Sequence, residues 1–220
     1  MGGMGIAESQ GVAGEGRAPV DGRKRRSERT RRAIVEAMHA LVVDGDPRPT
    51  AAAIASRAKL SVRSVFQHFG DLEEVFLAVA DIQVSQVGDL YAPLDYSSPQ
   101  LEVRLANWAL RRQRLHEETA PMRRAALLHE RSSKAVREGL ELARSVNRHD
   151  VVAAFAAELG PVDPADPADP AVVGRDWRLE SLTAVGSFRH WEVLRSACGL
   201  DSDTAREVLV SSARAILNAV

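Results

Sequence analysis

The chain has 220 residues, of which 45% are hydrophobic, 27% charged and 5% aromatic. A chain of this length can bury a core without disulfides, and this composition excludes disorder throughout. No apolar run approaches the roughly 20 residues that span a bilayer, and the first residues lack the charged start and apolar centre of a signal peptide. The single cysteine, Cys198, excludes an internal disulfide and a cysteine-based zinc site. We therefore expect a soluble, cytoplasmic protein without a metal or another cofactor.

The small net charge of -1 conceals three segments of different charge. Residues 1–22 carry -2, residues 23–70 carry +7 and residues 71–220 carry -6. A basic segment joined to an acidic remainder indicates that the basic part binds a polyanion. The alternative is a solvated tail, since seven of the eleven cations of the basic segment lie between Arg23 and Arg32.

Hydrophobic periodicity predicts four helices in the first part of the chain. Residues 1–22 are rich in glycine and lack periodicity, so we expect a disordered tail there. The first helix should run from about Ser27 to Val43. Three further helices should each begin with a side-chain cap, at Thr50, Ser61 and Asp71.

The rest of the chain also shows helical periodicity. We expect helices at about 101–118, from Pro121 onward, as one or two segments up to Gly160, and at about 177–198 and 203–219. The proline-rich segment 161–170 should be an extended loop, because proline lacks an amide donor and clashes inside a helix. No strand-like alternation of any length is present, so the predicted fold class is all-α.

Residues 50–69 have the spacing of a helix-turn-helix, in which the second helix can enter the major groove of DNA. The side of that helix expected to pack inward is apolar: Val62, Val65 and Phe69. The outward side carries polar residues suited to DNA: Arg63, Ser64, Gln67 and His68. Arginine can bind guanine and glutamine adenine, while serine and histidine reach phosphates. The alternative is an exposed helix without a partner, but such a helix normally carries some acids and this side has none.

The same segment resembles the DNA-binding domain of the TetR (tetracycline repressor) family of transcription regulators. The residues that match the family pattern in register are Thr50, Ile54, Ala55, Ala58, Ser61, Val65, His68, Phe69, Glu73 and Val75. The resemblance spans about residues 25–80, and a weaker likeness, W-E-V-L-R, begins at Trp191. It implies an all-α, TetR-like fold with an N-terminal three-helix DNA-binding domain, 23–70, and a larger helical ligand-sensing and dimerisation domain, 71–220.

The motif and the helix pattern together identify the residues expected to contact DNA. Bases should be read by Arg63, Ser64 and Gln67. The DNA backbone should be positioned by Thr50, Lys59, Phe66 and His68, and Arg48 and Ser61 complete the predicted DNA-binding set.

Three positions depart from the family pattern. Lys59 stands where the family has a turn glycine, and a lysine there costs about 1 kcal/mol in a left-handed conformation or forces another turn. Phe66 replaces a tyrosine and Leu72 replaces a lysine, so two phosphate-binding groups of the family are missing. The basic stretch from Arg23 to Arg32 could compensate by following the DNA backbone or entering the minor groove.

The predicted helix at 177–198 is apolar on two sides, so it must be covered on both. One side can pack on its own chain and the other on a second subunit, as the last two helices do in the TetR family. The expected dimer interface is Leu182, Gly186, Val193, Ala197, Val208, Ser212 and Ile216. A two-fold dimer would place two recognition helices about 34 Å apart on a palindromic operator. The alternative is a monomer in which this helix is simply central.

The resemblance also implies a ligand pocket in the second domain. The candidate lining residues are Trp108, His116, Met122, His129, Phe155 and Trp177, although each could instead be a core residue. A small apolar or aromatic effector would act by favouring a spacing of the two DNA-binding domains that does not fit DNA.

The predicted function is therefore a homodimeric, ligand-responsive regulator, more in the manner of a repressor than of an activator. No H-E-x-x-H metal motif, G-x-S-x-G motif or phosphate-binding glycine loop is present, so we do not expect an enzyme. Two alternatives stay open. One is a DNA-binding regulator without a small-molecule effector, and the other is a helical enzyme or interaction protein whose basic segment is incidental.

Overall fold

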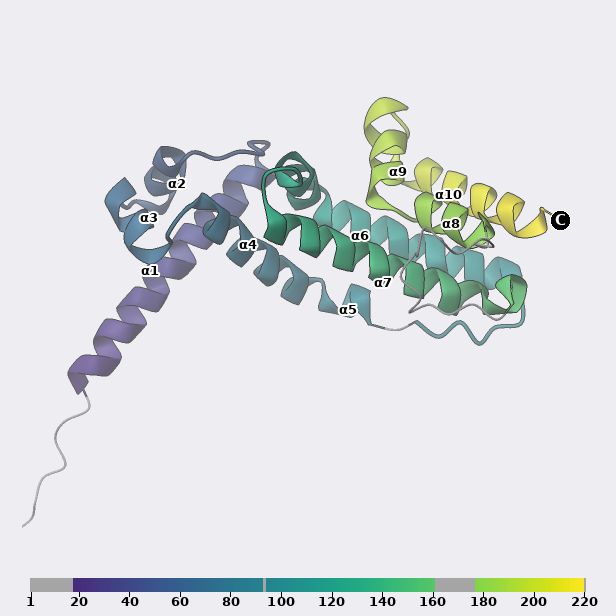
Figure 1. Cartoon of the computed structure of the whole chain (residues 1–220), viewed down its shortest axis with the longest axis horizontal. Coiled ribbons are helices and arrows are strands. Elements are labelled where there is room, and N and C mark those ends of the chain that lie inside the picture. Colours follow the sequence, from purple (N-terminus) through teal and green to yellow (C-terminus); the bar gives the residue numbers. More distant parts are fainter. Residues whose placement is uncertain (1–17, 93, 161–176, 220) are drawn as a thin grey trace, which may run out of the picture.

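The computed structural model describes residues 18–92, 94–160 and 177–219, and none of these residues forms a strand. The helices form an elongated molecule, with α1 to α4 (the head) at one end and α5 to α10 (the body) at the other (Figure 1). The all-α class predicted from the sequence is confirmed.

The head consists of α1 (Ala18–Val43), α2 (Ala51–Ala58), α3 (Val62–His68) and α4 (Leu72–Gln86). Helix α1 begins at Ala18 rather than at Ser27, so the last five residues of the expected tail are helical. Residues 1–17 lie outside the described part of the chain. The N-terminal half of α1 projects away from the rest of the molecule (Figure 1).

The core of the head is formed by α1, α2, α3 and α4 around fully buried side chains such as Ile34, Ile54, Val65 and Val75. This hydrophobic cluster continues without a break into the body, where Met122 and Val136 belong to it. Helix α4 therefore belongs to the core of the head, and the head and body are joined by apolar packing as well as by the chain.

The body begins with the short α5 (Gly88–Tyr91), followed by the long α6 (Leu101–His129) and α7 (Lys134–Leu159). The prediction that a new helix starts at Pro121 is wrong, because α6 continues through it. Pro121 leaves Glu117 O without its usual amide donor. On either side of it, the Thr119 hydroxyl donates to Leu115 O at 2.6 Å and Gln83 Nε2 donates to Glu118 O at 3.1 Å.

The C-terminal part contains α8 (Trp177–Val185), α9 (Phe188–Glu192), a π-helical turn (Val193–Ala197) and α10 (Ser202–Asn218). The prediction of a single helix at 177–198 is therefore wrong. The chain breaks after Val185, and the Ser187 hydroxyl accepts the His190 N–H to start α9. The caps predicted at Thr50, Ser61 and Asp71 are confirmed, and the side chain of Asp201 caps α10. The expected loop at 161–170 lies outside the described residues.

The core of the body lies between α6, α7, α8 and α10, with α9 packed at its edge. Its largest buried side chains include Trp108, Phe155, Leu182, Trp191 and Leu209. Trp108 and Phe155 meet edge to face with their ring centroids 5.5 Å apart, an arrangement that favours aromatic packing.

Candidate nucleic-acid interface and cavities

The helix-turn-helix is built from two short capped helices. Thr50 Oγ1 accepts the Ala53 N–H at the start of α2, and Ser61 Oγ accepts the Ser64 N–H at the start of α3. Each cap satisfies a backbone donor that the first helical turn leaves without a partner. Both hydroxyls keep their own hydrogen, so each can still donate to a phosphate.

Lys59 forms the turn between α2 and α3 in the left-handed conformation, with φ 57° and ψ 42°. Among the described residues it is the one non-glycine residue with positive φ. The backbone therefore keeps the conformation that favours glycine, and the lysine side chain, which is exposed, places a cation at the turn.

Helix α3 has a buried side and an exposed polar side. Val65 and Phe69 are almost completely buried. At roughly 100° per residue, Arg63 and Gln67 lie on the opposite side of the helix, with Ser64 at the edge of that side. Arg63 and Gln67 are exposed and Ser64 is half-buried.

Val62 does not pack inward as expected. It lies in the first turn of α3 and is 42% exposed, and Phe66, one turn later, is 46% exposed. These two side chains form an exposed apolar pair next to the polar side of α3.

The other residues predicted to contact the DNA backbone come next. Thr50, Lys59 and Ser61 are exposed, and His68 is half-buried at the end of α3. Lys59 and Ser61 directly precede α3, whereas Thr50 caps α2 and also lines the cavity at the junction of head and body.

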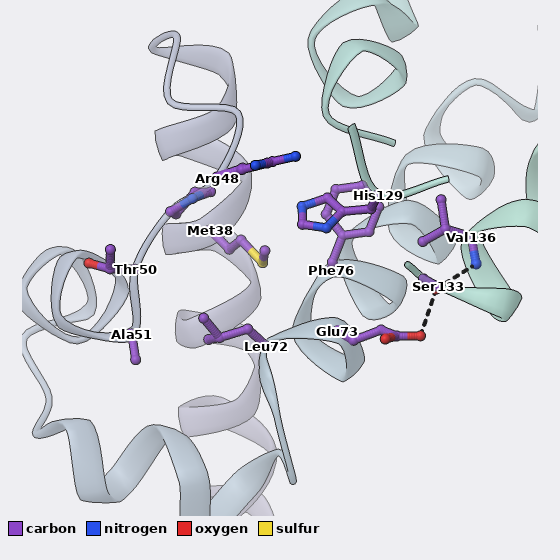
Figure 2. A pocket seen from close by; sticks show the side chains of 11 residues that line it. Met38, Arg48, Thr50, Ala51, Leu72, Glu73, Phe76, His129, Ser133 and Val136 are labelled. Atoms are coloured by element: carbon purple, nitrogen blue, oxygen red, sulfur yellow. Dashed lines mark hydrogen bonds between the residues drawn. The ribbon is translucent and has the colours of Figure 1, made fainter. Parts of the chain in front are cut away.

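Arg48 lies elsewhere. Its Nη2 donates to Leu128 O at 3.1 Å, near the C-terminus of α6. Figure 2 shows its side chain extending toward the junction of head and body, not along α3. The structure thus gives Arg48 a role in joining head and body, because a cation stabilises the carbonyls at a helix C-terminus.

Arg31 is a positioning residue that sequence reasoning missed. Its Nη1 donates to His68 O at 2.6 Å, and its guanidinium carbon lies 3.9 Å above the Phe69 ring. Arg31 therefore links α1 to the C-terminal end of α3. Within a run of seven cations, the sequence carries no signal that separates this one from its neighbours.

The N-terminal half of α1 is strongly basic and has no apolar face. Residues 22–29 are all exposed, and this stretch carries Arg23, Lys24, Arg25, Arg26 and Arg29. A helix with charges on all sides gains little from tertiary packing, so its helical form benefits from an anionic partner.

A cavity of about 320 Å³ lies where the head meets the body (Figure 2). Phe76 and His129 face each other across this region with ring centroids 5.5 Å apart. Ser133 donates to Glu73 Oε1 at 2.6 Å on one wall. Leu72, which stands where the TetR pattern has lysine, lines the cavity, so its role here is apolar packing at the junction.

A second cavity, of about 380 Å³, lies between α4, α6 and α7. Its wall is mainly apolar and includes Leu77, Val84, Met122 and Leu140, and its charged lining residues are Arg123 and Asp81. A cavity of this size and character is typical of sites for small organic molecules.

The residues predicted to share one ligand pocket do not come together. Trp108 and Phe155 are core residues, and Trp177 is 54% exposed at the start of α8. Met122 lines the 380 Å³ cavity, whereas His129 lines the junction cavity. His116 lines a third, small cavity. A tryptophan or phenylalanine on an amphipathic helix gives the same sequence signal whether it fills a core or lines a pocket.

Burial keeps His116 neutral. Its pKa is lowered to about 3, mainly by burial and then by the nearby charges of Arg112 and Arg123. Its Nε2 lies 3.1 Å from Gly186 O. Because a carbonyl only accepts, the ring proton is on Nε2 and Nδ1 is an acceptor.

Two of the predicted dimer contacts are inside the chain. Leu182 is completely buried, and Gly186 packs where a Cβ atom would lie 2.8 Å from both Asn147 Oδ1 and Trp108 Cζ2. Gly186 is therefore required for packing within one chain. Val193 and Ala197 are exposed on the π-helical turn, and three predicted residues of α10 are half-buried: Val208, Ser212 and Ile216.

Within the described residues, no group of three or more His, Cys, Asp or Glu side chains could hold a metal ion. The search for a helix long and apolar enough to cross a membrane, made over the same residues, found none.

The fold is similar to those of two solved bacterial proteins. One is a transcriptional regulator from a Rhodococcus species, with a TM-score of 0.59 and 15% identity over 87% of this chain and 95% of that one. The other is assigned to the TetR family of transcriptional regulators and comes from Mesorhizobium loti, with a TM-score of 0.52 and 18% identity over 87% and 96%. No family model matches the sequence, and no curated protein matches it either. The TetR-like fold expected from residues 25–80 is confirmed over most of the chain.

Proposed function

We propose that the protein is a TetR-type transcriptional regulator that inserts α3 into the major groove of DNA. The observation that carries this proposal is the polar side of α3, where the exposed Arg63 and Gln67 lie opposite the buried Val65 and Phe69 and the half-buried Ser64 lies at the edge. The fold shared with two transcriptional regulators supports it.

The chemistry of this surface suits base recognition. Arg63 can donate two hydrogen bonds to guanine and Gln67 can pair with adenine. The exposed pair Val62 and Phe66 suits the methyl group of thymine, which side chains contact by apolar packing. We therefore expect a half-site that contains guanine, adenine and thymine.

Contacts to phosphate would come from residues around α3 and from α1. Lys59 and Ser61 directly precede α3, Thr50 starts α2, and the basic half of α1 extends away from the rest of the molecule. Each lysine or arginine that neutralises a phosphate releases a counterion, so binding should weaken steeply with salt.

Two copies would act together. The surface that we assign to the dimer interface consists of the exposed Val193 and Ala197 and of a half-buried strip of α10 at the edge of the body core, which carries Val208, Ser212 and Ile216. A two-fold dimer through this surface would present two α3 helices to a palindromic site.

The 380 Å³ cavity is the site that we assign to an effector. Helix α4 forms one of its walls and belongs to the core of the head. A ligand that prefers one position of α4 would thereby favour one orientation of the head, and release from DNA follows if that orientation does not fit.

Selection of the full chain on random duplex DNA at near-physiological salt tests the proposal. We expect an inverted repeat to be enriched. Recovery of no preferred sequence, with binding that salt removes equally from all duplexes, would contradict sequence recognition by α3.

A further inference from the structure

The body contains buried positive charge in excess of its buried negative partner. Arg111 and Arg112 of α6 both donate to Asp150 of α7, at 2.9 and 2.7 Å, and all three side chains are buried. Tyr96 donates to the same carboxylate at 3.0 Å. One carboxylate thus serves two guanidinium groups, and burying an uncompensated cation is costly.

A small cavity of about 30 Å³ adjoins this cluster, with Arg112, His116 and Arg123 in its wall. Two buried atoms of these residues have no hydrogen-bond partner among the described residues, Arg112 Nε and His116 Nδ1. Both side chains are only 2% exposed. Buried polar atoms are nearly always satisfied in folded proteins, so these two indicate a bound polar group.

The two atoms specify the chemistry of that group. Arg112 Nε is a donor, while His116 Nδ1 is an acceptor because Nε2 donates to Gly186 O. The charged groups that line the cavity are Arg112 and Arg123 from α6 and Arg144 from α7, and the residues from the α8–α9 junction, Gly186, Ser187 and Phe188, carry no charge. A hydroxyl or a carboxyl group can meet both atoms, but only a carboxyl group also compensates the second buried guanidinium of the Arg111, Arg112 and Asp150 cluster. Its one oxygen accepts from Arg112, and a proton taken from solvent lies between the other oxygen and Nδ1.

The small cavity and the 380 Å³ cavity share two wall residues, Arg123 and Ala143. The guanidinium carbon of Arg123 lies 5.9 Å from the centre of the Phe188 ring, at the small-cavity end. A polar, cationic end is therefore adjacent to a largely apolar space.

We infer that the effector is an apolar monocarboxylate, with its hydrocarbon part in the 380 Å³ cavity and its carboxyl group against Arg112, Arg123 and His116. This inference rests on the proposed role of the larger cavity as the effector site. It narrows the effector from any small apolar molecule to one acidic class.

Calorimetric titration of the full chain with sodium octanoate, 1-octanol and octylamine tests the inference, because the three share one hydrocarbon chain and differ in the head group. We expect octanoate to bind at least about tenfold more tightly than octanol, octylamine not to bind, and octanoate binding to take up about one proton. If octanol binds as tightly as octanoate, the assignment of a carboxylate is wrong, but the assignment of the 380 Å³ cavity to an effector is still supported. If none of the three compounds binds, both the carboxylate assignment and the assignment of the cavity to an effector are refuted. DNA recognition by α3 is tested separately, by the selection on random duplexes.

Matched variants locate the head group. Arg123→Met should weaken octanoate about tenfold or more and leave octanol unchanged. Arg124→Met is the control, because Arg124 is exposed, pairs with Glu192 and lines neither cavity. Ala143→Leu, which narrows the shared wall without removing a charge, should also weaken octanoate. Unchanged octanoate affinity in both Arg123→Met and Ala143→Leu would overturn the assignment.

Discussion

In the function that we propose, sequence recognition depends most on two exposed side chains of α3, Arg63 and Gln67. We expect Arg63→Ala and Gln67→Ala each to reduce discrimination at one position of the half-site by about 1–3 kcal/mol, because each removes one side chain that can bond a base edge in two places. Both are exposed, so thermal unfolding should not change. Affinities for single-base variants of the selected duplex measure the effect, with the exposed body residue Arg131→Ala as control. An unchanged preferred sequence in either α3 variant would show that another surface reads DNA.

Lys59 combines backbone strain with a charge that faces solvent. Lys59→Gly should raise the free energy of unfolding by about 1 kcal/mol, because glycine adopts positive φ without a penalty. Lys59→Ala removes the charge but keeps the strain, so it should lower DNA affinity without this gain. Urea unfolding and DNA titration of the two variants separate the effects. Equal stability of the glycine and alanine variants would argue against strain at this turn.

Gly186 has the opposite character, since its small size is needed and its φ is ordinary. Gly186→Ala should destabilise the chain by about 1–3 kcal/mol, because the new Cβ atom would meet Asn147 and Trp108 at 2.8 Å. Gly139→Ala is the matched control. Gly139 lies inside α7, and the methyl group of an alanine there would meet no atom within 4 Å, so this change should stabilise by about 1 kcal/mol. Urea unfolding that gives the two changes the same sign would contradict this packing.

At the scale of the helix, the basic half of α1 should act through phosphate contacts alone. Lys24→Gln combined with Arg26→Gln should lower the slope of log affinity against log salt by about 2, because each phosphate that a cation neutralises adds about 0.9 to that slope. The preferred DNA sequence should stay the same. The double variant Arg131→Gln and Lys134→Gln, at exposed cations of the body, is the control. Equal slopes for the two double variants would show that α1 does not lie along DNA.

The elements of the head were predictable from local signals, while those of the body were less so. Thr50, Ser61 and Asp71 each cap a helix through a backbone donor only three residues away, which the sequence reveals directly. Gln83, which comes from another helix, donates to Glu118 O close to the point where α6 passes through Pro121. The break at Gly186 likewise depends on how closely α8 approaches Trp108 and Asn147. Contacts between distant residues override local periodicity at both places.

The candidate DNA-binding site likewise has features that the local sequence predicts and features that depend on contacts between distant residues. The polar side of α3 follows from helical spacing, so the exposure of Arg63 and Gln67 could be predicted from the sequence, while their contact with DNA stays a prediction. Arg31 and Arg48 were not assigned their roles, because their partners, His68 O and Leu128 O, are backbone carbonyls on other helices. A carbonyl carries no residue identity, and the sequence therefore gives no sign of such a contact.

At the scale of the whole molecule, the head and body share one hydrophobic cluster. Met122 and Val136 belong both to that cluster and to the wall of the 380 Å³ cavity. A ligand in the cavity therefore touches side chains that pack against the head. This continuity offers a direct physical route by which binding in the body would alter the position of α3.

The mass of the complex formed between the full chain and one selected duplex tests the dimeric reading of DNA most directly. We predict two chains on an inverted repeat whose half-sites lie about one helical turn, or about 34 Å, apart. A mass that rises with duplex length, without a preferred site, would contradict this and would mean that the basic segment only holds phosphates.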